Sequence, residues 1–302
     1  MSRTKVMNSN TAICAETARA KVNLALHVTG RRADGYHELD SLVVFADAGD
    51  RISATAAGKI SLTIEGAGAK ALPSDANNSV LAAAHALLNH AQTNGMDLSC
   101  AGADLVLDKS LPVSAGIGGG SADAAATLRA LNRLWGLNLP YIVLESIGIE
   151  LGADVAVCIA QRSSRMSGIG EILMPLTERH IPSFDVLLIN PGLPVSTPQV
   201  FQTLQNPEQS ALPILPAQSD AQSWLTWLRG TRNDLFEPAC KLCPDIEIVI
   251  SQLVHEGAQM ARMSGSGATC FGIFDNSQSA AIAAQALQRL HPNWWVCPTR
   301  TV

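Results

Sequence analysis

Apolar and polar residues alternate near the start of the chain, in the stretch ARAKVNLALHV. The alternation predicts a β-strand in which Val22, Leu24 and Leu26 share one face. Lys21 and Asn23 then point together from the opposite face. That face is either a solvated surface of an antiparallel sheet or a charged pair turned toward a cleft, and the alternation alone favours the solvated surface.

Strands and helices follow one another without a regular parallel rhythm, which predicts an α+β fold. Apolar alternation predicts strands over 41–47, 51–57, 60–66, 103–109, 185–191 and 293–301, a hairpin over 163–173, and two strands joined by a loop over 258–275. Helical spacing predicts helices over 77–92, 121–135, 140–160, 223–230, 244–257 and 279–290, and another that starts at Thr197-Pro198.

A shift of composition at residues 176–184 divides the chain. We therefore predict an N-terminal domain over 14–172 and a C-terminal domain over 173–302. Residues 205–222 are rich in Pro, Gln and Ser and form a predicted loop, whose role the pattern leaves open.

Glycines crowd the junction between the strand at 103–109 and the helix at 121–135, in the stretch LPVSAGIGGGSAD. They are Gly116, Gly118, Gly119 and Gly120. Glycines let a backbone turn sharply and approach a ligand with bare N–H groups. A strand, a glycine loop and a helix start, which Ser121 or Asp123 would cap, together predict an anion site, usually for phosphate. The alternative is a flexible turn, which rarely needs four glycines.

Composition narrows the class of protein further. Hydrophobic residues make up 47% of the 302 residues and charged residues 16%, which indicates a globular chain. The net charge is −5 with no basic cluster, so we expect no nucleic-acid partner. We also expect no membrane span and no signal peptide, and therefore a cytoplasmic protein. Seven scattered cysteines favour reduced thiols, and the single pair Cys240 and Cys243 is more simply explained by packing than by a metal site.

Two short stretches carry further chemistry. Asp34-Gly35 is a turn signal, and Tyr36 and His37 follow it; the simpler interpretation is a surface hairpin with a packed tyrosine. Asp154 lies among small and apolar residues in LGADV, where a carboxylate needs a partner or a function. Its simpler interpretation is a helix N-cap.

The glycine loop is neither a Walker A loop nor a G-x-G-x-x-G loop, because its spacing differs from both. Pro112, followed after three residues by GIGGGSA, resembles the ATP loop of the galactokinase, homoserine kinase, mevalonate kinase and phosphomevalonate kinase superfamily. The blocks AKVNLALHVTGRRADGYHELDSL, PVSAGIGGGSADAA, LGADVAV, NPGLPVSTPQVF and MSGSGATCFGIF resemble one family within it, the kinases of 4-diphosphocytidyl-2-C-methyl-D-erythritol. The sequence departs from that family at Ala156, where proline is common, and at Ser114-Ala115, where glycines are common.

The resemblance implies a two-domain small-molecule kinase fold, with the ATP loop between a strand and a helix of the N-terminal domain. It implies transfer of the ATP γ-phosphate to the 2-hydroxyl of 4-diphosphocytidyl-2-C-methyl-D-erythritol, in the non-mevalonate route to isoprenoids. The cofactors would be ATP and Mg²⁺, and the partner a small molecule, a cytidine diphosphate conjugate of methylerythritol. We expect a monomer or weak homodimer.

The same resemblance suggests roles for individual residues. Asp154 would accept the proton of the substrate hydroxyl, and Lys21 would pair with Asp154 and with the transferring phosphate. Asn23 would bind the polyol. Lys109 would help to bind the nucleotide or would be an ordinary strand-end lysine. The ATP phosphates would lie against Pro112, Val113, Ser114, Ala115, Gly116, Ile117, Gly118, Gly119, Gly120, Ser121 and Ala122, with Ser121 as a metal ligand.

For the cytosine, Tyr36 and Phe201 would form an aromatic sandwich, while His37 would contact its polar edge. Thr197, one helical turn before Phe201, belongs to the same predicted site.

Three other functions compete with this hypothesis. A dinucleotide-dependent oxidoreductase would need G-x-G-x-x-G, which is absent. A nucleotide sensor without catalysis would be expected to lack Lys21 or Asp154, and both are present. Another kinase of the superfamily is the nearest rival, and the turn at residues 34–37 argues against it.

Overall fold

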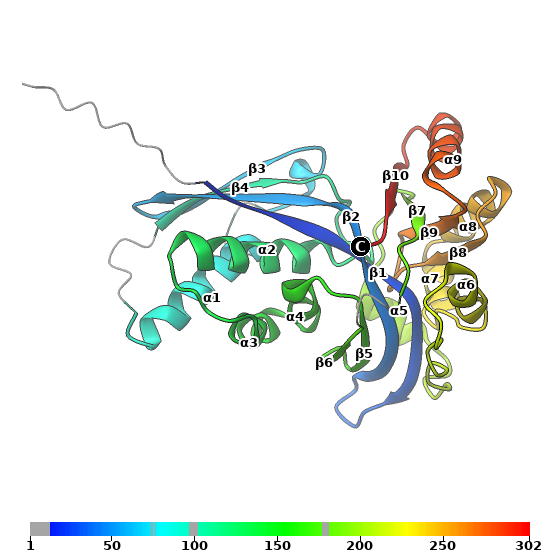
Figure 1. Cartoon of the computed structure of the whole chain (residues 1–302), viewed down its shortest axis with the longest axis horizontal. Helices are drawn as coiled ribbons and strands as arrows, with labels where there is room; N and C mark the ends of the chain where they lie inside the picture. Colours follow the sequence, from blue (N-terminus) through cyan, green and yellow to red (C-terminus); the bar gives the residue numbers. More distant parts are fainter. Residues whose placement is uncertain (1–12, 74, 76, 97–101, 177–180) are drawn as a thin grey trace, which may run out of the picture.

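A computed structural model describes residues 13–73, 75, 77–96, 102–176 and 181–302. Two sheets lie side by side, each with its own helices (Figure 1). This arrangement confirms the predicted α+β composition. Within the described residues, no helix is both long and apolar enough to span a bilayer.

The first sheet has six strands in the order β3-β4-β2-β5-β6, with β1 paired to β2. These are β1 (Ile13–Arg31), β2 (His37–Ala57), β3 (Ile60–Glu65), β4 (Gly102–Asp108), β5 (Ser164–Gly168) and β6 (Ile172–Pro175). A short 3₁₀ turn (Ala69–Ala71) follows β3, and the helices of this part are α1 (Ser79–Thr93), α2 (Gly119–Leu134), α3 (Tyr141–Leu151) and α4 (Ala153–Ala160).

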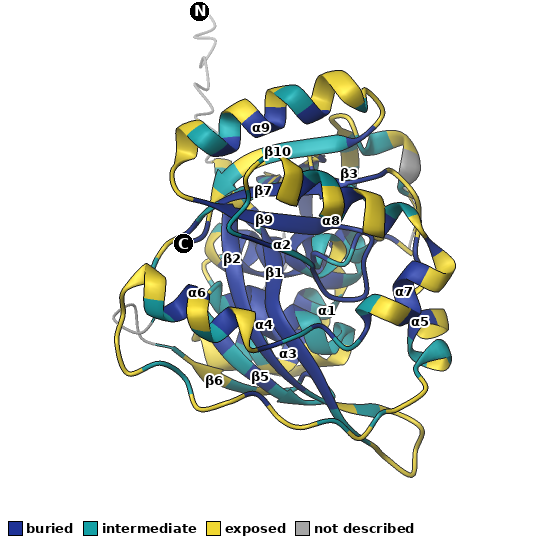
Figure 2. Ribbon diagram, turned by 90° about the vertical axis from the view of Figure 1, so that its right-hand side faces the viewer, coloured by how far each residue is buried: buried dark blue, intermediate teal, exposed yellow. Residues whose placement is uncertain are grey.

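The second sheet is antiparallel, in the order β10-β7-β9-β8. Its strands are β7 (Asp185–Asn190), β8 (Met260–Met263), β9 (Cys270–Phe274) and β10 (Trp295–Arg300). Its helices are α5 (Thr197–Thr203), α6 (Ala221–Arg229), α7 (Phe236–Leu242), α8 (Asp245–His255) and α9 (Ser277–Leu290). Figure 2 shows β7 and β9 buried, while the outer sides of α8 and α9 are exposed.

The long antiparallel pair β1–β2 joins the two sheets. Its register shifts between Arg19 and Lys21 and between Asn23 and Ala25, and such bulges bend a strand. Beside these bends, the pair has apolar packing on both faces, one against α1–α4 and the other against the second sheet. The expectation of a solvated face was therefore wrong: Lys21 and Asn23 are 3% and 2% exposed.

Three buried clusters stabilise this arrangement. One packs the first sheet against α1–α4. A second packs one face of the second sheet against α7, α8 and α9. A third lies between β1–β2 and the second sheet, where Leu24, Trp224 and Phe271 meet, and Ile117 of the glycine loop inserts into it. The loop is thus anchored at the junction of the two halves.

Several local predictions need correction. The strands expected at 41–47 and 51–57 are one strand, β2, because hydrogen bonding to β1 continues through Gly49. The helix expected over 140–160 is broken at Gly152, whose φ of 160° and ψ of 145° are not helical. Helix α2 begins at Gly119, earlier than expected, so neither Ser121 nor Asp123 caps it.

Residues 204–220 contain no helix or strand, as the composition of 205–222 predicted. This segment is held along β1 and β2 by polar contacts. The Gln209 amide donates to the Val28 carbonyl at 3.0 Å, and the Leu212 amide donates to Asp40 at 2.8 Å. Arg165 binds the same Asp40 carboxylate with two hydrogen bonds.

His27 connects this segment to the second half of the chain and is 1% exposed. Its Nδ1 donates to the Ser210 carbonyl at 2.8 Å, and its Nε2 accepts the Arg232 amide at 3.2 Å. Burial lowers the pKa of His27 below 6.5, because the cationic ring is poorly solvated there. The native state therefore holds a neutral ring in one tautomer.

We expect the free energy of unfolding to fall as the pH drops below about 6.5, because the unfolded chain then binds a proton that native His27 does not. Urea unfolding between pH 5 and 8 measures this dependence. His27→Gln should flatten it, whereas His85→Gln, on an exposed part of α1, should leave it unchanged. Equal pH dependence of unfolding in the wild type and His27→Gln would show that His27 is not its source.

Candidate active site

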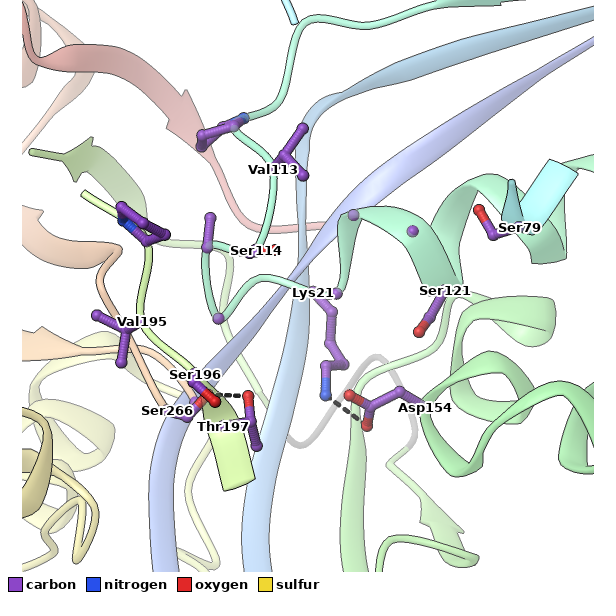
Figure 3. Close-up of a pocket in the computed structure, with 18 of the residues that line it drawn as sticks. Lys21, Ser79, Val113, Ser114, Ser121, Asp154, Val195, Ser196, Thr197 and Ser266 are labelled. Carbon is purple, nitrogen blue, oxygen red and sulfur yellow. Dashed lines mark hydrogen bonds and ion pairs between the residues drawn. The ribbon is translucent and has the colours of Figure 1, made fainter. Parts of the chain in front are cut away.

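A cavity of about 960 Å³ opens between the two halves of the molecule. Its walls come from β1, the glycine loop, the start of α4, the start of α5 and the Ser264–Gly267 loop. Figure 3 shows Lys21, Ser121, Asp154 and Thr197 around it. Side chains far apart in the sequence therefore share one space.

The glycine loop presents backbone to this cavity. Residues 112–116 and 118–121 line it, whereas Ile117 and Ala122 are buried behind it. Gly118 takes a left-handed conformation with a φ of 65° and precedes α2, and no side chain of the described residues caps that helix. An uncapped helix start turned toward a cavity favours an anion such as a phosphate group.

A second glycine loop, Ser264–Gly267, holds the first one in place. The Ser264 hydroxyl donates to the Gly116 carbonyl at 3.0 Å, and the Thr269 amide donates to the Ala115 carbonyl at 3.1 Å. A Cβ on Gly116 would lie 2.5 Å from the Ser264 carbonyl oxygen, so only glycine permits this approach. The sequence of this block indicated a loop between two strands but no role for it.

Lys21 and Asp154 form the charged pair of the cavity. Lys21 Nζ lies 2.7 Å from Asp154 Oδ1, although 133 residues separate them in the chain. The lysine side chain is 4% exposed, and the aspartate side chain, in the first turn of α4, is 43% exposed. Pro112 and the rest of the glycine loop lie across the same cavity, so a bound phosphate would lie near this pair.

Asn23 also lines the cavity. Its amide nitrogen donates to the Ser41 hydroxyl at 2.8 Å, and its backbone N–H donates to the Ser264 hydroxyl at 3.1 Å. It therefore links β1, β2 and the second glycine loop while bordering the space where a ligand would lie.

Lys109 lies beneath the glycine loop, with Nζ at 2.5 Å from Asp50 and 2.7 Å from Asp123. Burial lowers its pKa, but the Asp123 and Asp50 carboxylates outweigh burial and raise it above the ordinary value. The ammonium is thus charged and held by two carboxylates. Lys109 is therefore not an ordinary strand-end lysine, because it is buried and paired twice. It also borders the cavity, and its contact with a nucleotide stays a prediction.

The three residues predicted to bind the cytosine lie near one another only in part. His37, not Tyr36, stacks on Phe201, with ring centroids 5.0 Å apart and planes inclined by 23°. Tyr36 is 62% exposed at the β1–β2 turn. The β1–β2 pairing places His37 at the start of β2, so its ring reaches α5 first. Burial and then Arg31 lower the pKa of His37, which favours a neutral ring.

Thr197 begins α5, as predicted, and lines the cavity together with Phe201. Its hydroxyl lies 2.7 Å from that of Ser266 (Figure 3). Gly265, Ser266 and Asn77–Ser79 at the start of α1 are cavity residues that sequence reasoning missed. Adjacent serines and glycines at 264–267 were the available signal, whereas tertiary packing alone brings 77–79 to the cavity.

Comparison with known proteins supports a kinase site. The model of the GHMP kinases N terminal domain matches residues 78–162, and that of the GHMP kinases C terminal domain matches residues 216–293. A Methanococcus jannaschii mevalonate kinase shares the fold at a TM-score of 0.70 and 12% identity, over 98% of this chain and 99% of that one. The fold and site therefore define a small-molecule kinase of the GHMP class, and the predicted fold is confirmed.

Proteins with higher sequence identity to this chain identify one family within the class. The chain is 48% identical to a 4-diphosphocytidyl-2-C-methyl-D-erythritol kinase of Cereibacter sphaeroides, over 94% of this chain and 98% of that protein. It is 46% identical to that of Ruegeria pomeroyi, with the same coverage. A crystal structure of a kinase of this name matches with a TM-score of 0.74 and 30% identity, over 95% and 99% of the two chains. The chain belongs to the 4-diphosphocytidyl-2-C-methyl-D-erythritol kinase family.

We expect Gly119→Val to weaken ATP binding, because a Cβ there would lie 3.2 Å from Lys109 Nζ. A branched side chain would press on that ammonium and displace the backbone that faces the phosphate. Calorimetry with ATP measures the affinity. Gly58→Val is the matched control, since its Cβ would meet nothing within 4 Å. Unchanged ATP affinity in Gly119→Val would place the phosphate site elsewhere.

Proposed function

We propose that this protein transfers the γ-phosphate of ATP to the 2-hydroxyl of 4-diphosphocytidyl-2-C-methyl-D-erythritol. One observation carries the proposal: the Lys21–Asp154 pair shares a cavity with the uncapped, glycine-rich start of α2. The family supports the choice of substrate. The role would belong to the non-mevalonate route to isoprenoid precursors.

Asp154 accepts the proton of the attacking hydroxyl in this mechanism. An ionised carboxylate is a weak base for an alcohol, so the proton moves late, as the new oxygen–phosphorus bond forms. Lys21 holds the carboxylate in place and balances negative charge on the transferring phosphate. Asn23 orients the polyol from the same strand.

The glycine loop binds the ATP phosphates through its N–H groups and the positive end of α2. Mg²⁺, when bound, neutralises charge on the phosphate oxygens. This ion commonly uses only one or two protein oxygens together with substrate phosphates, and the Ser121 hydroxyl borders the cavity where it could serve as one.

We assign the ATP site to the N-terminal domain, residues 14–172, and propose that the C-terminal domain, residues 173–302, closes the substrate side of the cavity. The glycine loop belongs to the first part, and α5 with Thr197 and Phe201 belongs to the second. All these groups come from one chain, which suits a monomer or weak homodimer.

An ADP-release assay across alcohols tests the proposal. We expect turnover with the cytidylyl substrate and none with mevalonate, homoserine or galactose. Turnover with one of those alcohols instead would make the protein a different kinase of the same class.

Asp154→Asn should lower turnover by roughly 10²–10⁴, because the acceptor of the hydroxyl proton is lost while the shape is kept. ATP affinity and the melting temperature should change little. Asp47→Asn is the control, since Asp47 pairs with Arg19 and its side chain is 61% exposed.

Lys21→Ala should lower turnover by a similar factor, and the double variant should lower turnover by far less than the product of the two single factors. Additive losses would mean that the two residues act separately.

A second test concerns how the cytosine of the substrate is bound. A 5.0 Å stacking distance leaves no room for a base between His37 and Phe201. We therefore propose that the base takes the position over Phe201, that Tyr36 covers its second face, and that His37 turns to its polar edge. Stacking is worth roughly 1–3 kcal/mol per base, so Tyr36→Ala and Phe201→Ala should each raise the KM for the cytidylyl substrate about 5- to 150-fold.

The KM for ATP should remain unchanged in both variants. Tyr141→Ala is the matched control, because Tyr141 is the second of the two tyrosines and is 50% exposed on α3. If ATP affinity falls while cytidylyl affinity holds, the two ends of the cavity have been assigned the wrong way round.

A further inference from the structure

A buried ion cluster, formed by Lys109, Asp50 and Asp123, lies behind the glycine loop and takes no direct part in the mechanism. All three residues are at most 1% exposed. They come from different elements: Asp50 from β2, Lys109 from the residue after β4, and Asp123 from α2. The cluster therefore joins two strands to the helix that follows the loop.

The cluster holds both ends of the loop. Asp50 Oδ1 accepts the backbone N–H groups of Ser110 at 2.6 Å and Leu111 at 2.7 Å, which fixes the entrance of the loop. Lys109 Nζ binds Asp50 Oδ2 at 2.5 Å and Asp123 Oδ2 at 2.7 Å. Since Asp123 lies just after the loop, a single ammonium connects the entrance to the exit.

The ammonium also lies directly behind the phosphate-facing backbone. A Cβ built on Gly119 would be 3.2 Å from Lys109 Nζ. The packing of Lys109 is itself tight, because a Cβ on Gly68 would lie 2.6 Å from Lys109 Cγ. The lysine and the first turns of α2 are thus closely packed and joined by the Lys109–Asp123 ion pair.

We propose that Lys109, Asp50 and Asp123 are positioning residues that set the spacing between the two ends of the glycine loop and thereby the affinity for ATP. Lys109 and Asp123 also border the cavity, and the role proposed for all three residues is to position the loop. The inference rests on the proposed function, and it makes this cluster responsible for the geometry of the site that binds the ATP phosphates. Backbone N–H groups bind phosphate well only when their positions relative to one another are kept to within fractions of an ångström.

Asp123→Asn tests the proposal, because it keeps the size of the side chain and leaves Lys109 paired with Asp50. We expect the Kd and KM for ATP to rise about tenfold or more, with kcat at saturating ATP and the KM for the cytidylyl substrate close to wild type. Amide hydrogen exchange should quicken at residues 110–122 and remain unchanged in the last turns of α2. Asp50→Asn, which weakens the hydrogen bonds that hold the entrance of the loop, should likewise raise the Kd and KM for ATP and leave kcat and the KM for the cytidylyl substrate close to wild type.

Glu16→Gln is the matched control. Glu16, on β1, pairs with Arg129 and Arg133 of α2, away from the loop. Its substitution should therefore lower the free energy of unfolding without changing the KM for ATP. Equal ATP affinity in the wild type and Asp123→Asn would overturn the proposal. So would a loss of ATP affinity in all variants that merely follows the loss of stability. If the wild type itself does not bind ATP, the proposed function fails instead.

Discussion

The close contact between two glycine loops is the constraint on which the rest of the site depends. Gly116 and Gly265 approach so closely that a Cβ on Gly265 would lie 2.7 Å from the Gly116 carbonyl oxygen. One loop belongs to the first sheet and the other to the second, so this contact sets how the two halves meet. Both loops border the cavity, which also holds Lys21, Asp154 and Thr197.

Two buried lysines near the cavity have different functions because their partners differ. Lys21 has a half-exposed aspartate beside it and a cavity in front, so its charge is available to a ligand. Lys109 is enclosed by two buried carboxylates, so its charge is used within the protein. Burying an ammonium is costly unless it is paired, and the number and exposure of the carboxylates decide what the lysine can do.

Much of the fold was predictable from local pattern. The strands β7, β8, β9 and β10 and the start of α5 at Thr197 agree with expectation, since each depends on nearby residues. The errors lie where distant packing overrides a local signal. Gly49 interrupts an apolar pattern, yet β1 pairs across it, and Gly152 breaks a run that reads as one helix.

The class of chemistry follows from the sequence alone, because a phosphate loop is local: strand, glycines and helix start are consecutive in the chain. Lys21 and Asp154 were also candidates from the sequence. Their contact, the burial of the strand face with Lys21 and Asn23, and the pairing of Lys109 with Asp123 became visible only in the folded chain. These outcomes depend on which surfaces pack on β1–β2 and on the bulges that bend it, and residue alternation cannot distinguish a face covered by a second sheet from one exposed to water.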